Sequence, residues 1–153
     1  MKSRTRARAL ALQVLYEIDI ASHPPGDVLQ HRLEEEEEFS DELAEFARQI
    51  IFGVLPLAAD LDRIIAVYAP EWPLEQIAAI DRNILRLACW EFTVQGETPL
   101  KVAINEAVEL AKLFGSESSP RFVNGVLGSL ADHRREIGQQ LQNARLALAG
   151  KSP

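Results

Sequence analysis

The residues best suited to chemistry are basic side chains at the very start of the chain. Lys2, Arg4, Arg6 and Arg8 come before any acidic residue, in a chain whose formal net charge is −7. An arginine guanidinium can hold a phosphate group through two hydrogen bonds and can also stack on a nucleobase. A solvated, fraying helix end is the plainer interpretation of these arginines. The separation of positive from negative charge favours a phosphate-binding role, and hence nucleic acid.

Phe122 is the second candidate for nucleic-acid chemistry. It lies in the segment RFVNGVLG and falls off the apolar stripe formed by Val123, Leu127 and Leu130. Two interpretations are open. Phe122 packs against a neighbouring helix, or it is an exposed ring that stacks a nucleobase beside the amides of a helix N-terminus.

Gly125 and Gly128 interrupt the helical pattern of this same segment. A glycine within a helix costs about 1 kcal/mol relative to alanine. We therefore expect a compensating close approach at these positions, either of another helix or of a ligand backbone.

Other kinds of active site find little support in the sequence. No phosphate-binding glycine loop or dinucleotide motif occurs, and the spacing of His23, His31 and His133 is not that of metal ligands. The single Cys89 falls within an apolar helix, as is typical of a small buried hydrophobe, and it excludes a disulfide framework. We therefore expect no enzyme activity, no cofactor and no bound metal.

The composition predicts a cytoplasmic protein with a substantial core. The chain has 153 residues, of which 47% are hydrophobic, enough for one domain or for two small subdomains that share a core. No apolar run long enough to span a membrane and no signal-peptide pattern is present. The net acidity argues against general electrostatic binding of nucleic acid, but it permits a local basic patch and suits a basic protein partner.

Apolar residues recur at three- and four-residue spacing along most of the chain, which predicts an all-α protein. The first helix is apolar over so much of its surface that it should lie at the centre of the fold. Pro56 should kink or divide a long helix at 40–69, which Pro70 and the Trp72-Pro73 pair should end. The run of five acids at 34–38 is expected to be solvated or loosely ordered. The other predicted helices cover 1–22, 27–33, 74–79, 81–95, 98–114 and 119–130, and a helical extension reaches about residue 149.

Three long blocks follow one another in a characteristic order. They are RTRARALALQVLY at 4–16, IDRNILRLACWEF at 80–92, and KVAINEAVELAKLFG with FVNGVL at 101–127. Together they resemble the NusB family of bacterial transcription antitermination factors, over nearly the whole chain up to about residue 134. The resemblance implies about seven helices in two packed small bundles, at about 1–70 and 71–134. A helical extension at 135–153 that frays into a flexible tail would follow.

The same resemblance implies a function in RNA binding. Family members bind the boxA element of ribosomal RNA leader transcripts together with NusE, a protein of the small ribosomal subunit, and help to load an antitermination complex on RNA polymerase. Their RNA contacts come from the arginine-rich first helix and from the aromatic residue of the FVNG motif. These contacts correspond here to Arg4, Arg6, Arg8 and Phe122. Further contacts are expected, from position alone, at Lys101, Arg121 and Asn124, and Lys2 belongs to the same basic start.

This chain departs from the family within the arginine run. Relatives carry consecutive arginines where Thr5 separates Arg4 from Arg6 here. The resemblance therefore leaves open a lower RNA affinity or a shifted pattern of contacts.

The resemblance also implies a surface for NusE. It involves the tyrosine that ends the LY pair and an acidic residue before the LR block, here Tyr16 and Asp81, and Tyr68 is a further candidate. A carboxylate at the rim of an interface would orient a basic partner. Asp81 is equally explained as a simple helix cap. Some family members form homodimers that hide these surfaces, so a homodimer is a further expectation that stays open.

Two rival functions remain open. A NusB-like domain also stands at the N-terminus of an rRNA cytosine methyltransferase, but that enzyme needs a long C-terminal cofactor-binding domain, which we do not expect in a chain ending at Pro153. The other rival is a helical protein–protein adaptor that keeps the fold with weak or lost RNA binding.

Overall fold

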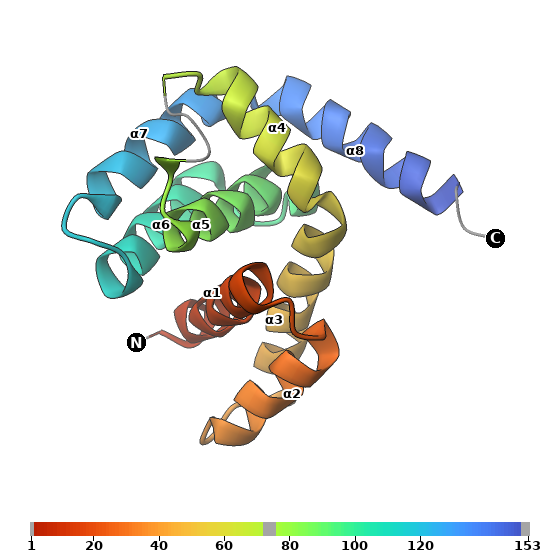
Figure 1. Ribbon diagram of the computed structural model, residues 1–153, viewed down its shortest axis with the longest axis vertical. Helices are drawn as coiled ribbons and strands as arrows, with labels where there is room; N and C mark the ends of the chain where they lie inside the picture. Colours follow the sequence, from red (N-terminus) through yellow and green to blue (C-terminus); the bar gives the residue numbers. More distant parts are fainter. Residues whose placement is uncertain (1, 72–75, 151–153) are drawn as a thin grey trace.

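The computed structural model describes residues 2–71 and 76–150, and these form eight α-helices without any strand (Figure 1). The predicted all-α class is confirmed. The predicted Trp72-Pro73 stop and the first two residues of the predicted turn at 74–79 lie outside the described residues. The helices are α1 (Ser3–Ala21), α2 (Pro25–Glu35), α3 (Asp41–Val54), α4 (Ala58–Tyr68), α5 (Ala79–Trp90), α6 (Leu100–Phe114), α7 (Ser119–Ala131) and α8 (Arg134–Gly150).

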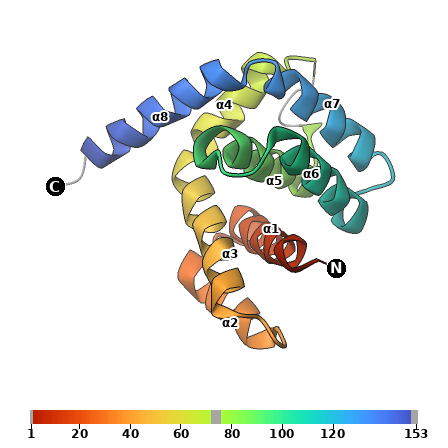
Figure 2. The same cartoon turned by 180° about the vertical axis from the view of Figure 1, so that it is seen from behind.

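Helix α1 lies at the centre of the fold, as its broad apolar surface predicts. It packs against α2, α3 and α5, and both views show it enclosed between α3 and the α5–α6 pair (Figures 1 and 2). Ala7, Ala11, Leu12 and Val14 are completely buried. Burial of a leucine or valine side chain contributes roughly 1.5–3 kcal/mol to the stability of the fold. The buried face of α1 therefore fixes the position of the basic residues at its N-terminus.

Pro56 divides the long helix predicted at 40–69. A short 3₁₀ turn, Leu55–Leu57, separates α3 from α4, because proline lacks the N–H that would continue the α-helical ladder. At the other end of α3, the Ser40 hydroxyl accepts a hydrogen bond from the backbone N–H of Leu43 at 3.1 Å. This is the expected N-cap, and it fixes where α3 begins after the acidic segment.

Helix α5 connects the two halves of the chain. It packs against α1 and α3 on one side and against α6 and α7 on the other. It continues into a π-helical turn, Glu91–Gln95, and ends at Gly96, which has a positive φ of 68°. Helices α6 and α7 form an antiparallel hairpin against it. The division into bundles at about residue 70 stays a prediction.

One alternative is wrong for Asp81 and one for the two glycines. Asp81 is not a helix cap, because α5 begins at Ala79 with Ala78 at the cap position. No other described helix approaches Gly125 or Gly128 closely: both are exposed, and a Cβ atom at either would meet nothing within 4 Å. The first half of α7 therefore keeps an open face, and the close approach of a ligand backbone to it stays a prediction.

Helix α8 is the predicted C-terminal extension. Its first half is anchored through the buried Ile137 and Leu141, whereas residues 145–150 are exposed. Both views show its end projecting beyond the other helices (Figures 1 and 2). Among the described residues, no helix is both long and apolar enough to cross a membrane.

Candidate nucleic-acid interface

The start of α1 presents Lys2 and Arg4 to solvent. Both side chains are exposed, and the Arg4 guanidinium lies 4.7 Å from the ring centroid of Phe46 on α3. This cation–π contact orients the arginine without neutralising its charge. Lys2 and Arg4 therefore remain available for phosphate groups.

Arg6 is held by the segment between α2 and α3. Its guanidinium donates to the Glu36 carboxylate at 2.9 Å and to the Glu37 carbonyl at 3.1 Å, and it lies 5.1 Å from the Phe39 ring centroid. The acidic run, expected to be solvated, thus contributes a direct contact to a candidate RNA residue. A phosphate that binds Arg6 must compete with the Glu36 carboxylate.

Arg8 does not belong to the exposed set, which corrects its expected RNA contact. The residue is only 3% exposed, and its Nε lies 3.0 and 3.1 Å from the two carboxylate oxygens of Glu91, itself 1% exposed. Its Nη1 lies 3.7 Å from Glu106 on α6. Arg8 lies on the buried face of α1, four residues before Leu12, and its charge is paired with carboxylates inside the protein.

Thr5 also faces inward. It is buried, and its hydroxyl donates to the Glu106 carboxylate at 2.9 and 3.1 Å. Thr5 is therefore not a gap in an exposed arginine series. The sequence carries the signal that would have shown this, because Thr5, Arg8, Leu12 and Leu15 follow the three- and four-residue spacing of one helix face.

The second group of candidate residues lies on α6 and α7. Lys101, Arg121 and Asn124 are exposed. Phe122 is partly buried and packs against the core, as the first interpretation of this residue expected. Phe122 also lines a pocket of about 720 Å³ with Arg121 and Gly125.

Helix α6 links the two groups of candidate residues. It is bonded to the start of α1 through Thr5 and Glu106, and it packs against α7. The chain N-terminus and the turn between α6 and α7 lie on the same side of the molecule in both views (Figures 1 and 2). The fold thus brings the basic start and the α7 start to one side.

Asp81 lies inside the protein, which corrects its expected position at an interface rim. It is 7% exposed, and its Oδ2 accepts a hydrogen bond from the Ser119 hydroxyl at 3.0 Å. Its Oδ1 is buried without a hydrogen-bond partner among the described residues. Burial raises the pKa of this carboxyl above its ordinary value, against the opposing effect of the Ser119 hydrogen bond. Asp81 lines the same pocket as Phe122.

The two candidate tyrosines lie in different surroundings. Tyr16 is half-buried and lines a pocket of about 300 Å³ with Arg32, Ile80 and Phe114. Tyr68 is tied to α8: its hydroxyl accepts a hydrogen bond from Gln140 at 2.9 Å, and its ring centroid lies 4.8 Å from that of His133. Tyr16 thus lies beside the start of α5, whereas Tyr68 is occupied by the C-terminal extension.

Sequence reasoning missed an ion network that joins α1, α4 and α5. Arg82 lies 2.6 Å from Asp19, and the Asn83 amide donates to the same carboxylate at 3.0 Å. Arg86 donates from Nε to Asp62 at 2.7 Å. Burial opposes ionisation of Asp19, but the hydrogen bonds from Arg82 and Asn83 and the charge of Arg86 outweigh it and lower its pKa. Local sequence held no signal for these long-range pairs.

The described residues include no arrangement suited to metal binding or to thiol chemistry. Within residues 2–71 and 76–150, no three His, Cys, Asp or Glu side chains are grouped to hold a metal ion. Cys89 is completely buried, and burial raises the pKa of its thiol to about 12. Such a thiol is protonated at neutral pH and is a poor nucleophile.

The chain is similar to known proteins in both sequence and fold. The model of the NusB family matches residues 5–132. The transcription antitermination protein NusB of Roseiflexus castenholzii is 51% identical over 135 residues, which cover 87% of this chain and 94% of that protein. A crystal structure of NusB from T. maritima has a TM-score of 0.75 at 30% identity and covers 90% of this chain and 96% of that one.

A second structural neighbour is an assembly. It is a crystal structure of the antitermination factors NusB and NusE in complex with double-stranded RNA. The matched chain has a TM-score of 0.76 at 26% identity, and the match covers 85% of this chain and 96% of that one.

Proposed function

This chain belongs to the NusB family, and we propose that it is a transcription antitermination factor that binds boxA RNA of ribosomal RNA leader transcripts together with NusE. The observation that supports the proposal is that the chain N-terminus, the region of Lys2, Arg4 and Arg6, and the turn between α6 and α7, which precedes Phe122, lie on the same side of the molecule (Figures 1 and 2). One bound RNA segment can then meet phosphate-binding and base-stacking groups together. The complex would join the antitermination assembly on RNA polymerase, in the cytoplasm.

The mechanism is binding rather than catalysis. Lys2, Arg4 and Arg6 would hold RNA phosphates, with Lys101, Arg121 and Asn124 as additional contacts from α6 and α7. Phe122, in the wall of the pocket of about 720 Å³, would stack an unpaired base, a contact worth roughly 1–3 kcal/mol. No cofactor and no metal takes part in this mechanism.

NusE would bind beside the start of α5. Tyr16 and its pocket offer an apolar contact there, and the overall charge of −7 favours association with a basic protein. Asp81 would act through its position beneath Ser119 at the start of α7, not as an exposed rim charge. Tyr68 is the weaker candidate, because α8 already engages its hydroxyl.

The alternative is an adaptor with little RNA binding. It is favoured by the ion pairs of α1. Arg8 pairs with Glu91 and Arg6 pairs with Glu36, and both pairs reduce the exposed positive charge of α1. An adaptor would bind NusE equally well with or without RNA.

A titration of labelled boxA RNA against a scrambled RNA, with and without purified NusE and at two salt concentrations, tests the proposal. We expect selective binding that strengthens with NusE and weakens with salt. The Arg4→Ala variant should lower the slope of log affinity against log salt by roughly 1, because one phosphate contact is lost. Arg63→Ala, on the exposed face of α4, is the matched control. NusE binding without any preference for boxA RNA would establish the adaptor instead.

A further inference from the structure

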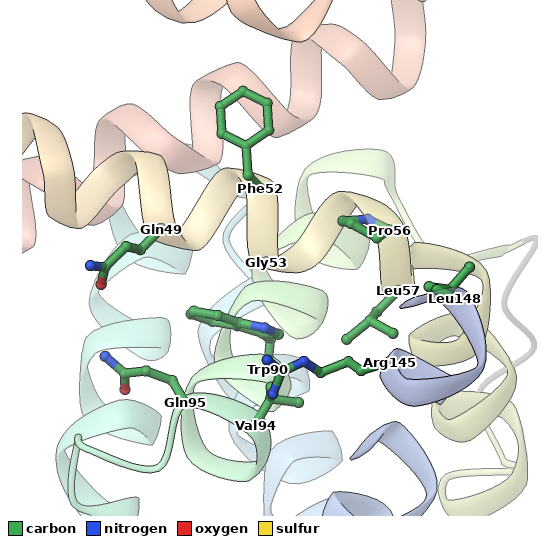
Figure 3. Close-up of a pocket in the computed structure, with 10 residues that line it drawn as sticks. All are labelled: Gln49, Phe52, Gly53, Pro56, Leu57, Trp90, Val94, Gln95, Arg145 and Leu148. Carbon is green, nitrogen blue, oxygen red and sulfur yellow. The ribbon is translucent and has the colours of Figure 1, made fainter. Parts of the chain in front are cut away.

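A groove of about 570 Å³ lies between α3, the π-helical turn Glu91–Gln95 and the end of α8. Figure 3 shows the Trp90 ring at its centre, beneath Gly53 of α3, with Arg145 reaching toward it from α8. A Cβ atom at Gly53 would overlap the Trp90 ring, so only a glycine lets α3 approach the indole this closely. The groove is therefore formed by the packing of the chain itself.

Two hydrogen-bond donors of this groove lack an anionic or buried acceptor. Trp90 is only 7% exposed, and its indole N–H has no hydrogen-bond partner among the described residues. Arg145 donates from Nη1 to Gln142 at 3.1 Å, but no carboxylate lies within ion-pair distance of it in the described part of the chain. A polar group that is buried without a partner destabilises a protein, so an acceptor supplied by a ligand would be favoured here.

The groove favours an anion, although the chain as a whole is acidic. The net charge is −7, with 23 acidic residues, yet the described residues that line the groove include neither aspartate nor glutamate. Two acids close to the lining in sequence are already paired, Glu45 with Arg48 at 2.9 Å and Glu91 with Arg8. Arg145 is therefore the one charged group in the described lining, and its charge attracts a carboxylate.

The other walls of the groove are largely apolar and reach the protein surface. Phe52 is 45% exposed and Leu148 is 44% exposed, and both line the groove with Trp90. Exposed apolar side chains that gather at a groove are typical of an interaction surface. A small anion would leave Phe52 and Leu148 in water, whereas a peptide can place apolar side chains on both sides of a carboxylate. A single arginine among apolar residues suits nucleic acid poorly, because tight binding of its backbone needs several cations.

We propose that this groove binds a segment of a protein partner in which one aspartate or glutamate stands between apolar residues. The carboxylate of the segment pairs with the Arg145 guanidinium, and the indole N–H of Trp90 donates to an oxygen of the same segment. Its apolar side chains cover Phe52 and Leu148. The charge-assisted hydrogen bonds of Arg145 give the groove its preference for a carboxylate over a neutral amide.

The groove is separate from the surfaces proposed above for RNA and NusE. Trp90 ends α5, whereas Tyr16 lies beside the start of α5, and a helix of 12 residues is roughly 16 Å long. The end of α8 and the chain N-terminus lie at opposite sides of the molecule in both views (Figures 1 and 2). An acidic partner in the groove is therefore compatible with RNA at the basic start of α1.

NMR spectroscopy of the full chain labelled with ¹⁵N tests the proposal through the indole N–H of Trp90. The chain has two tryptophans, and Trp90→Phe identifies which of the two indole resonances belongs to Trp90. The probe is the capped peptide acetyl-Ser-Leu-Phe-Glu-Leu-Leu-Ser-amide, and the control peptide has glutamine in place of glutamate. We expect the glutamate peptide to shift the Trp90 resonance and to bind about fivefold or more tightly than the glutamine peptide, because only glutamate forms a charged pair with Arg145.

Two pairs of variants separate the charge from the apolar contact. Arg145→Gln should make the affinities for the two peptides equal, whereas Arg135→Gln, which removes the same charge from α8 outside the lining, should keep the preference. Leu148→Ala should weaken binding of the glutamate peptide about threefold or more, because apolar contact area is lost. Leu146→Ala is its control, since Leu146 is 61% exposed on the same helix but does not line the groove.

The outcomes are distinct from those of the function proposed above, because the peptide readout needs neither RNA nor NusE. An unmoved Trp90 resonance at millimolar peptide, equal affinities for the two peptides, or equal losses within either pair of variants would overturn the inference. A Trp90 resonance that follows boxA RNA but not the peptide would assign the groove to nucleic acid instead. Saturation with NusE should leave the peptide affinity unchanged, and competition between the two would overturn the separation of the surfaces.

Discussion

Arg8 and Glu91 form a buried ion pair in which the arginine Nε lies 3.0 and 3.1 Å from the two carboxylate oxygens. The pair joins α1 to the π-helical turn that follows α5, and it divides the basic start into two kinds of arginine. Arg8 stabilises the fold, whereas Arg4 is exposed and free to bind a ligand. Substitutions at these two positions should therefore have different consequences.

We expect Arg8→Ala to lower the free energy of unfolding by roughly 3–5 kcal/mol, because Glu91 would be left buried without a compensating charge. Urea unfolding measures this change. Arg4→Ala is the control, and it should change stability by less than about 1 kcal/mol while it weakens RNA binding. An Arg8→Ala protein with unaltered stability and weakened RNA binding would restore Arg8 to the RNA-binding set.

The Arg6–Glu36 contact predicts that the acidic segment restrains RNA binding. Glu36→Gln should raise RNA affinity about two- to fivefold, since a partly exposed ion pair is worth up to about 1 kcal/mol. Glu37→Gln is a matched control, because it removes the same charge but Glu37 meets Arg6 through its backbone carbonyl. Fluorescence anisotropy with labelled RNA measures both variants. Equal gains would show that only the net charge matters and not the contact.

The buried position of Thr5 predicts the effect of an arginine substituted there on stability and on RNA binding. Thr5→Arg should destabilise the protein and should not strengthen RNA binding, because this position is buried against Glu106. Ser3→Arg is the matched comparison, since Ser3 is exposed at the first turn of α1 and accepts a long side chain. Salt-dependent RNA titrations and thermal unfolding distinguish the two variants. Tighter RNA binding by Thr5→Arg than by Ser3→Arg would contradict the buried placement.

The sequence was sufficient to predict the helices but not the interaction partners of Arg8 and Asp81. Apolar spacing and Pro56 were sufficient to predict α1, the break between α3 and α4, and the α6–α7 hairpin, because these features depend on residues near one another in the chain. The partners of Arg8 and Asp81 depend on which helices meet in three dimensions: Glu91 lies 83 residues from Arg8, and Ser119 lies 38 residues from Asp81. No local pattern encodes such pairs, although the spacing of Arg8 and Leu12 does indicate that Arg8 faces inward.

Asp81 and Asp19 should change stability with pH in opposite directions. The pKa of Asp81 is raised, so the folded state binds a proton more readily than the unfolded state, and stability falls as the pH rises above about 4. The pKa of Asp19 is lowered, so its contribution is present above about pH 4 and is lost as the pH falls through the folded-state pKa. Asp81→Asn should therefore stabilise the protein at neutral pH, on the order of 1 kcal/mol, and Asp19→Asn should destabilise it.

Urea unfolding of these two variants at neutral pH and at about pH 3 provides the test. The difference for Asp81→Asn should shrink at the acidic pH, where the raised pKa leaves the Asp81 carboxyl protonated as well. The difference for Asp19→Asn should shrink less, because the lowered pKa keeps Asp19 ionised to a lower pH. A destabilised Asp81→Asn protein at neutral pH would show that the Asp81 charge has a partner that stabilises it. NusE binding by Asp81→Asn should weaken only if the charge itself contributes to that interface.

A substitution at Gly125, near the start of α7, should have opposite effects on the stability of the free chain and on ligand binding. Its exposed surroundings leave room for a Cβ atom, so Gly125→Ala should stabilise the free chain by about 0.5–1 kcal/mol. It should also weaken binding of RNA or NusE if either approaches this face closely. Gly53→Ala is the comparison: it should destabilise the protein by roughly 1–3 kcal/mol, because the added methyl group would overlap the Trp90 ring. Thermal unfolding together with RNA and NusE titrations measures each effect. A more stable Gly125→Ala protein with unchanged binding would remove the open face of α7 from the interface.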